Sequence, residues 1–162
     1  MPSANDLAWL AGFIDGEGSI CLLPRRTTGI TPACTIYNTD LSVLEIIRGW
    51  FGGQLYVKRR SPKRKPVGHL VFQNDRALRV LHSVRPYLRV KHRQADLALV
   101  FEHAPRYQGF RRRVEGHYLT SIPNDVIEFR KLLVDEVRAL NKRGPKENAS
   151  SQQSSESLLC GV

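Results

Sequence analysis

Long apolar runs are missing from this 162-residue sequence, and cysteine is scarce. No stretch approaches the roughly 18 apolar residues of a membrane span, and the first residues lack the charged and apolar regions of a signal peptide. Cys21, Cys34 and Cys160 are too few and too widely spaced for a disulfide framework or a zinc site. We therefore expect a soluble intracellular protein in a reducing compartment, without distinguishing organelle, nucleus or prokaryotic cytoplasm.

Acidic residues are outnumbered, with 15 Asp and Glu against 25 Lys and Arg, which gives a net charge of +10. Twelve of the basic residues lie within residues 58–93, where Asp75 is the single acid. Positive charge concentrated in this way favours a polyanionic partner, held by electrostatic attraction and counterion release. Nucleic acid is the first candidate for that partner.

The pattern of apolar and turn-forming residues predicts an α+β fold in one domain, residues 1–143. The polar segment 144–162 has too little apolar content to order and is predicted to be a disordered tail. The predicted elements are helix 6–15, strands 19–26 and 31–38, helix 40–51, strands 54–60 and 67–73, a helical stretch from 75 that breaks at Pro86 and resumes over 87–103, and helix 123–141. A Gly- and Arg-rich stretch, 104–121, separates the last two.

Two sets of polar residues are predicted to begin the first two helices. Asn5 and Asp6 are available as N-caps of the first helix, and Gly16 and Gly18 can terminate it. Ser42 and Glu45 have capping-box spacing near the start of the second helix.

Small residues recur along one face of the first helix, at Ala8, Gly12 and Gly16. A glycine inside a helix costs roughly 1 kcal/mol relative to alanine, so this spacing suggests a packing reason. We predict that a second helix crosses here at short range, and a symmetric copy of the chain is the obvious partner.

Two acids, Asp15 and Glu17, lie at the C-terminal end of that helix, where the helix dipole disfavours negative charge. Something positive should offset them. If two copies of the helix pack together, two Glu17 carboxylates approach one another, and a hard divalent cation with oxygen ligands is one solution. The alternative, that Glu17 is a solvated turn residue, remains open from these residues alone.

The segment LAGFIDGEG at residues 10–18 resembles the LAGLIDADG signature of a homing endonuclease family. TIYNTD at 35–40, FGG at 51–53 and RPYLRVKHRQ at 85–94 are similar to family segments in the expected order. The resemblance implies an αββαββα fold with a curved four-stranded antiparallel sheet that binds DNA. A single motif implies a homodimer that cleaves both strands of a long pseudopalindromic double-stranded target and promotes intron mobility.

The resemblance also suggests catalytic roles. Glu17 and the carbonyl oxygen of Gly16 would hold Mg²⁺, with Ca²⁺ or Mn²⁺ as substitutes, and no organic cofactor is expected. Asp40 would orient metal-bound water, although an Asp that opens a helix is commonly an N-cap. Lys91 would lie near the hydrolytic water, or would be an ordinary phosphate-contacting or solvated lysine. Leu44 stands where some relatives have a basic residue, so the catalytic surroundings differ here.

Strand alternation separates Ile20 and Leu22 from the opposite face, which the resemblance assigns to DNA. The predicted DNA contacts are Cys21, Leu23, Arg25, Tyr37, Lys58 and Arg60, with Lys63, Arg64 and Lys65 gripping phosphates. Alternation does not settle which face of strand 67–73 is outward, so His69 and Gln73 are weaker candidates.

Two other functions are compatible with much of the sequence. A non-catalytic binder of the same fold, either an RNA maturase or a DNA-binding regulator, would have the same basic sheet. The acid at Glu17 favours cleavage, because like charges at an interface are a liability without metal chemistry. A basic ribosome-associated protein fits the composition but not the motif.

Overall fold

The computed structural model describes residues 1–24, 29–59, 61–62, 64–103, 111–114, 117–120 and 123–142. Its elements are α1 (Ala4–Glu17), β1 (Gly18–Pro24), β2 (Ile30–Asn38), α2 (Leu41–Phe51), β3 (Gln54–Lys58), β4 (Val67–Gln73), α3 (Asp75–Val84), α4 (His92–His103), β5 (Arg111–Val114), β6 (His117–Thr120) and α5 (Asn124–Leu140). The predicted αββαββα order is confirmed as the first seven elements. The predicted tail and the ends of two predicted strands, at residues 25–26 and 60, lie outside the described residues.

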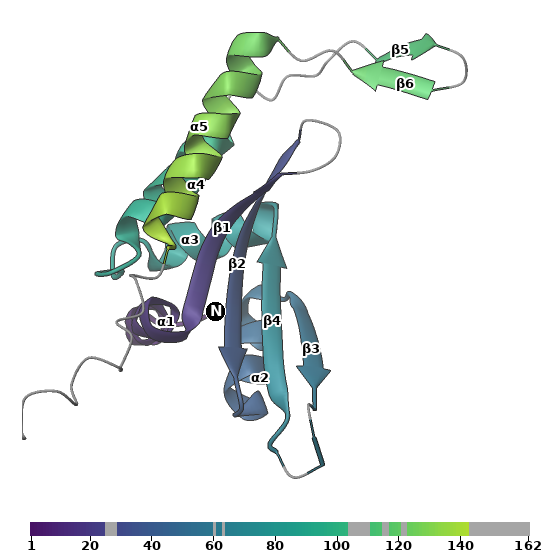
Figure 1. Ribbon diagram of the computed structural model, residues 1–162. Coiled ribbons are helices and arrows are strands. Elements are labelled where there is room, and N and C mark those ends of the chain that lie inside the picture. The colour runs from purple at the N-terminus through teal and green to yellow at the C-terminus, as the bar shows by residue number, and fades with distance from the viewer. Residues whose placement is uncertain are drawn as a thin grey trace, which may run out of the picture.

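Four strands form an antiparallel sheet in the order β1-β2-β4-β3. In this order β2 and β4 are the central strands, and the pairing register places Tyr37 opposite His69, which in turn lies opposite Tyr56. One face of the sheet is covered by helices, and α2 and α3 lie behind the strands in Figure 1.

The core lies between that face and the helices. It contains the inward side chains of alternating strand residues, such as Ile20, Ile36 and Phe72, together with Leu10 and Ile14 of α1, all with 0% exposure. These burials follow from the period of two in a strand, which sends successive side chains to opposite faces.

The helix α2 approaches β4 closely at Gly68. A Cβ atom added there would lie 2.4 Å from Leu44 Cδ1 and 2.7 Å from Leu41 Cδ2. Leu44 is fully buried. Leu44 therefore belongs to the core of this chain and contributes no charge to the site.

The predicted N-caps Asn5 and Asp6 were wrong for α1, whereas the alternative role given to Asp40, an N-cap that opens its helix, is confirmed. Ser3 caps α1 through a capping box, in which its hydroxyl accepts from the Asp6 N–H at 3.3 Å and its own N–H donates to Asp6 Oδ2 at 2.8 Å. Asp40, and not Ser42, caps α2. The helix α1 begins before the apolar periodicity does, because exposed polar residues can occupy its first turn.

The connection between α3 and α4 also differs from the prediction. A helix was expected from residue 87, whereas α4 begins at His92 and residues 85–91 form turns and bends. The N–H groups of Arg89, Val90 and Lys91 bond to the Asp15 carboxylate instead of helical carbonyls. A contact distant in sequence therefore overrides local helix propensity here.

A second, two-stranded sheet, formed by β5 and β6, was missed in the stretch 104–121 (Figure 1). No helix among the described residues has both the length and the apolar character needed to cross a bilayer.

Candidate nucleic-acid interface and catalytic site

The face of the four-stranded sheet opposite the core is open. Ile20 and Leu22 are buried, whereas Cys21 is half-buried and Leu23 is exposed, which confirms the predicted alternation of β1. The strand β4 has Leu70 and Phe72 in the core, so its other face is the outward one. The residues on the open face include Ser19, Cys21, Leu23, Thr35, Tyr37, Gln54, Tyr56, Lys58, Val67, His69 and Gln73.

Three aromatic rings from neighbouring strands form a row across this face. Tyr37 and His69 are stacked, with ring centroids 4.0 Å apart and an interplanar angle of 6°, and Tyr56 lies 6.2 Å from His69. Tyr56 also donates a hydrogen bond to Gln54 Oε1 at 2.7 Å. Sequence reasoning missed Tyr56 and Gln54, although both share the alternation of the predicted contact Lys58.

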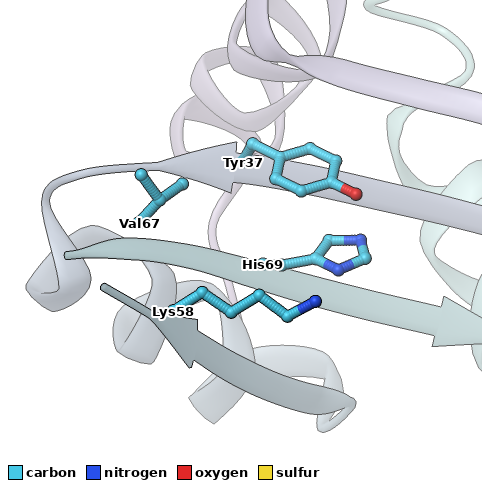
Figure 2. Close-up of a pocket in the computed structure, with 4 residues that line it drawn as sticks. All are labelled: Tyr37, Lys58, Val67 and His69. Atoms are coloured by element: carbon cyan, nitrogen blue, oxygen red, sulfur yellow. The ribbon is translucent and has the colours of Figure 1, made fainter. Parts of the chain in front are cut away.

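Two hollows lie side by side on this face. One, of about 240 Å³, is lined by Tyr37, Lys58, Val67 and His69 (Figure 2). The other, of about 290 Å³, is lined by Glu17, Tyr37, Asn38, Thr39 and Val67. Because Tyr37 and Val67 line both hollows, the two hollows adjoin and together extend from Lys58 to Glu17.

His69 is held in its neutral form by its surroundings. Burial lowers the pKa of the imidazole, and the nearby positive charge of Lys58 lowers it further. Its Nε2 atom is buried and has no partner among the described residues.

The C-terminal end of α1 is fixed by two groups of contacts. The Asp15 carboxylate accepts from the N–H groups of Arg89 at 2.8 Å, Val90 at 3.1 Å and Lys91 at 2.8 Å. In return the Lys91 ammonium donates to the carbonyl oxygens of Ile14, at 3.1 Å, and Asp15. Positive charge therefore meets the negative end of the helix dipole.

Positive charge was expected to offset both acids, and Lys91 provides it beside Asp15. Burial raises the pKa of Asp15, but the three N–H donors and Lys91 outweigh it and hold the pKa below its ordinary value. Asp15 is thus satisfied within the chain. Glu17 is exposed, and no hydrogen bond or ion pair joins its carboxylate to another described residue.

The structure shows the N-cap contacts of Asp40. Its carboxylate accepts from the Ser42 N–H at 3.0 Å and the Ser42 hydroxyl at 2.6 Å, and the hydroxyl contact chiefly lowers its pKa. Lys65, exposed in the loop before β4, lowers it as well. Arg64 is also exposed in that loop, whereas Arg25, Arg60 and Lys63 lie outside the described residues.

Several solved structures share this architecture. The homing endonuclease I-CvuI, solved with the I-CreI target in the presence of magnesium, aligns over 88% of this chain and 85% of its own, at 23% identity and a TM-score of 0.61. The archaeal intron-encoded homing endonuclease I-Vdi141I, complexed with DNA, aligns over 88% and 87%, at 18% identity and a TM-score of 0.61. The chain has the homing endonuclease fold. No protein-family model and no curated protein sequence matches the chain.

Glu17 and Gly16, the predicted metal ligands, lie at the C-terminal end of α1. The described residues contain no group of three or more His, Cys, Asp or Glu arranged to hold a metal ion. The Glu17 carboxylate and the Gly16 carbonyl oxygen are hard oxygen donors of the kind that Mg²⁺ and Ca²⁺ prefer. Their chemistry therefore fits a divalent ion, although two donors are fewer than the roughly six oxygen ligands that such ions take.

The Asp15 contacts predict a large stability effect. Asp15→Asn should lower the free energy of unfolding by about 2 to 3 kcal/mol, because an amide NH₂ replaces an acceptor oxygen in front of N–H donors. Asp135→Asn is the matched control, since its ion pair with Arg138 is exposed and contributes less than about 1 kcal/mol. Urea unfolding at one fixed protein concentration measures both, and equal losses would contradict the assignment.

The His69 surroundings predict a pH dependence. Its folded-state pKa should lie below the ordinary 6.5, so the fold loses stability as the pH falls through 6.5 towards the folded-state pKa, whereas well above 6.5 the ring is neutral in both states and contributes no slope. Lys58→Met should raise the pKa partway towards 6.5, because burial remains. NMR titration of the ring protons, assigned with His69→Gln, measures both values, and a wild-type midpoint at or above 6.5 would refute this environment.

Proposed function

We propose that this chain is a homing endonuclease of the LAGLIDADG family with a single motif. As a homodimer it cleaves both strands of a long pseudopalindromic DNA target by metal-dependent hydrolysis and promotes intron mobility. The observation that carries the proposal is the position of Glu17. This carboxylate, which has no partner among the described residues, ends the motif helix and lines a hollow that continues into the open face of the sheet.

Double-stranded DNA is favoured over single-stranded RNA by the aromatic row. Tyr37 and His69 stack on each other, so the ring faces between them are not free to stack on unpaired bases. Lys58 adds a donor beside the row, and Arg64 and Lys65 place positive charge in the adjoining loop. Such a face is better suited to base edges in a groove, flanked by phosphates.

Catalysis is assigned to the groups around the end of α1. Glu17 and the Gly16 carbonyl would hold a divalent ion, which when bound polarises the scissile phosphate and stabilises the leaving oxygen. Lys91 holds the last carbonyls of α1 and thereby positions Glu17, and its positive charge lies near the site. Asp40 caps α2 and retains its negative charge beside Asn38, whose side-chain oxygen accepts from the Asp40 N–H at 2.8 Å.

The homodimer is proposed from the exposed face of α1. Ala8, Gly12 and Gly16 are exposed there, and a Cβ atom added at either glycine would meet nothing within 4 Å. Trp9, with 45% exposure, continues this face and contacts Trp50 of α2 edge-on. Pairing two copies along it would cover apolar surface and bring two Glu17 carboxylates together.

The metal chemistry has a direct test. The substrate is a duplex that joins the sequences flanking the coding frame, because an intron-encoded enzyme should cut the uninterrupted site. Wild type should cut both strands with magnesium and stop when EDTA removes it. Glu17→Gln should reduce the rate at least about 100-fold while still binding, because one metal-ligating oxygen is lost.

Glu45→Gln is the matched control, since Glu45 is an exposed acid of α2 that pairs with Arg48. It should cut at the wild-type rate. Wild-type binding without any metal-dependent cutting would overturn the endonuclease proposal and favour the non-catalytic binder of the same fold.

The dimer has its own test by sedimentation. Wild type at micromolar concentration should sediment at twice 18.4 kDa. Gly12→Leu should shift it to the monomer without unfolding it, because the protomer has open space at this position. Ala139→Leu, a small-to-large change on an exposed part of α5, should leave the dimer intact. A monomeric wild type would contradict the proposal.

A further inference from the structure

We propose that the hollow lined by Tyr37, Lys58, Val67 and His69 selects a base with a carbonyl oxygen at its major-groove edge, either guanine or thymine. This inference rests on the proposed function and specifies what that function recognises. It concerns the half of the open surface that lies away from Glu17.

The hollow is rich in hydrogen-bond donors. Lys58 carries three N–H donors and no acceptor, and the Tyr37 hydroxyl can donate. No carboxylate lines the hollow. Guanine presents O6 and N7 as acceptors and thymine presents O4, whereas adenine and cytosine present an amino group at the corresponding position. An amino group opposite the Lys58 ammonium would place donor against donor.

The aromatic rings present their edges, and not their faces, to a ligand. Neighbouring strands lie about 4.8 Å apart, so directly paired residues whose rings are nearly parallel at 4.0 Å must hold those rings upright on the sheet. In Figure 2 the Tyr37 hydroxyl and the Lys58 ammonium extend on either side of the His69 ring. Their polar atoms therefore flank a position that a base edge can enter.

The neutral state of His69 limits what the hollow can accept. Because its pKa is lowered, the ring adds no positive charge beside Lys58 at neutral pH. A phosphate would therefore meet one cation among uncharged groups here. This balance favours a base edge, while the exposed Arg64 and Lys65 in the loop are better placed for phosphates.

Val67 provides the contact that separates the two bases. It lies directly opposite Lys58 in the strand register and lines the same hollow. Its methyl groups suit the C5-methyl group of thymine, which guanine lacks. Guanine and thymine share the carbonyl oxygen, and contact between Val67 and a methyl group would favour thymine.

The experiment selects duplexes from a randomised pool, with calcium in place of magnesium so that binding is measured without cutting. Wild type, Lys58→Met and Lys131→Met are compared, since Lys131 is an exposed lysine of α5 outside this face. We expect one position in each half-site where wild type prefers guanine or thymine over adenine and cytosine by about 5- to 150-fold. Lys58→Met should flatten that preference, and Lys131→Met should preserve it.

Duplexes with modified bases then show whether thymine or guanine provides the carbonyl oxygen. If the position is thymine, uracil should weaken wild-type binding but not that of Val67→Ala. If it is guanine, 6-thioguanine, in which a weakly accepting sulfur replaces O6, should weaken wild-type binding but not that of Lys58→Met. Circular dichroism confirms that each variant is folded.

The outcomes separate the two proposals. A wild type that enriches no duplex sequence would overturn the proposed function and this inference together. Enrichment of a site in which Lys58→Met relaxes no position, or relaxes one that prefers adenine or cytosine, would overturn this inference alone.

Discussion

The arrangement of the site depends on one reciprocal contact between distant parts of the chain. Asp15 accepts three N–H groups from residues 89–91, and Lys91 donates back to the last carbonyls of α1. Each partner satisfies groups that would otherwise lack bonds at a helix end or in an irregular segment. Because β1 begins at Gly18, directly after α1, the same contact fixes Glu17 relative to the sheet.

That connection explains how the motif helix can have two separate surfaces. Leu10 and Ile14 are buried in the core and hold α1 to the sheet, while Gly12 and Gly16 leave the opposite side of the helix open. Glycine would weaken an isolated helix by roughly 1 kcal/mol at each position. The buried side chains and the contacts of Asp15 offset this cost and leave the small-residue face available for another helix.

Sequence alone predicted the parts of the fold that depend on local pattern. The alternation of Ile20 and Leu22 and the order of the first seven elements follow from periodicity and from the motif. The hydrogen bonds between Asp15 and residues 89–91 were not predictable in this way. Their donors lie more than 70 residues away and interrupt a segment that otherwise favours helix. The outward direction of His69 also required the core, since alternation gives two faces but not which one is buried.

The open face divides its charge in a way that suits the recognition of a duplex. Lys58 is the single charged residue among the described strand residues on that face. The loop that follows β3 has further described cations. Phosphates lie along the rims of a groove and base edges at its floor, so cations at the ends of the strands give affinity without sequence information. In the proposed complex, uncharged groups such as Tyr37 and His69 would face the bases, where a cation would attract phosphates of any sequence. Lys58 can serve selectivity because it lies beside that uncharged row.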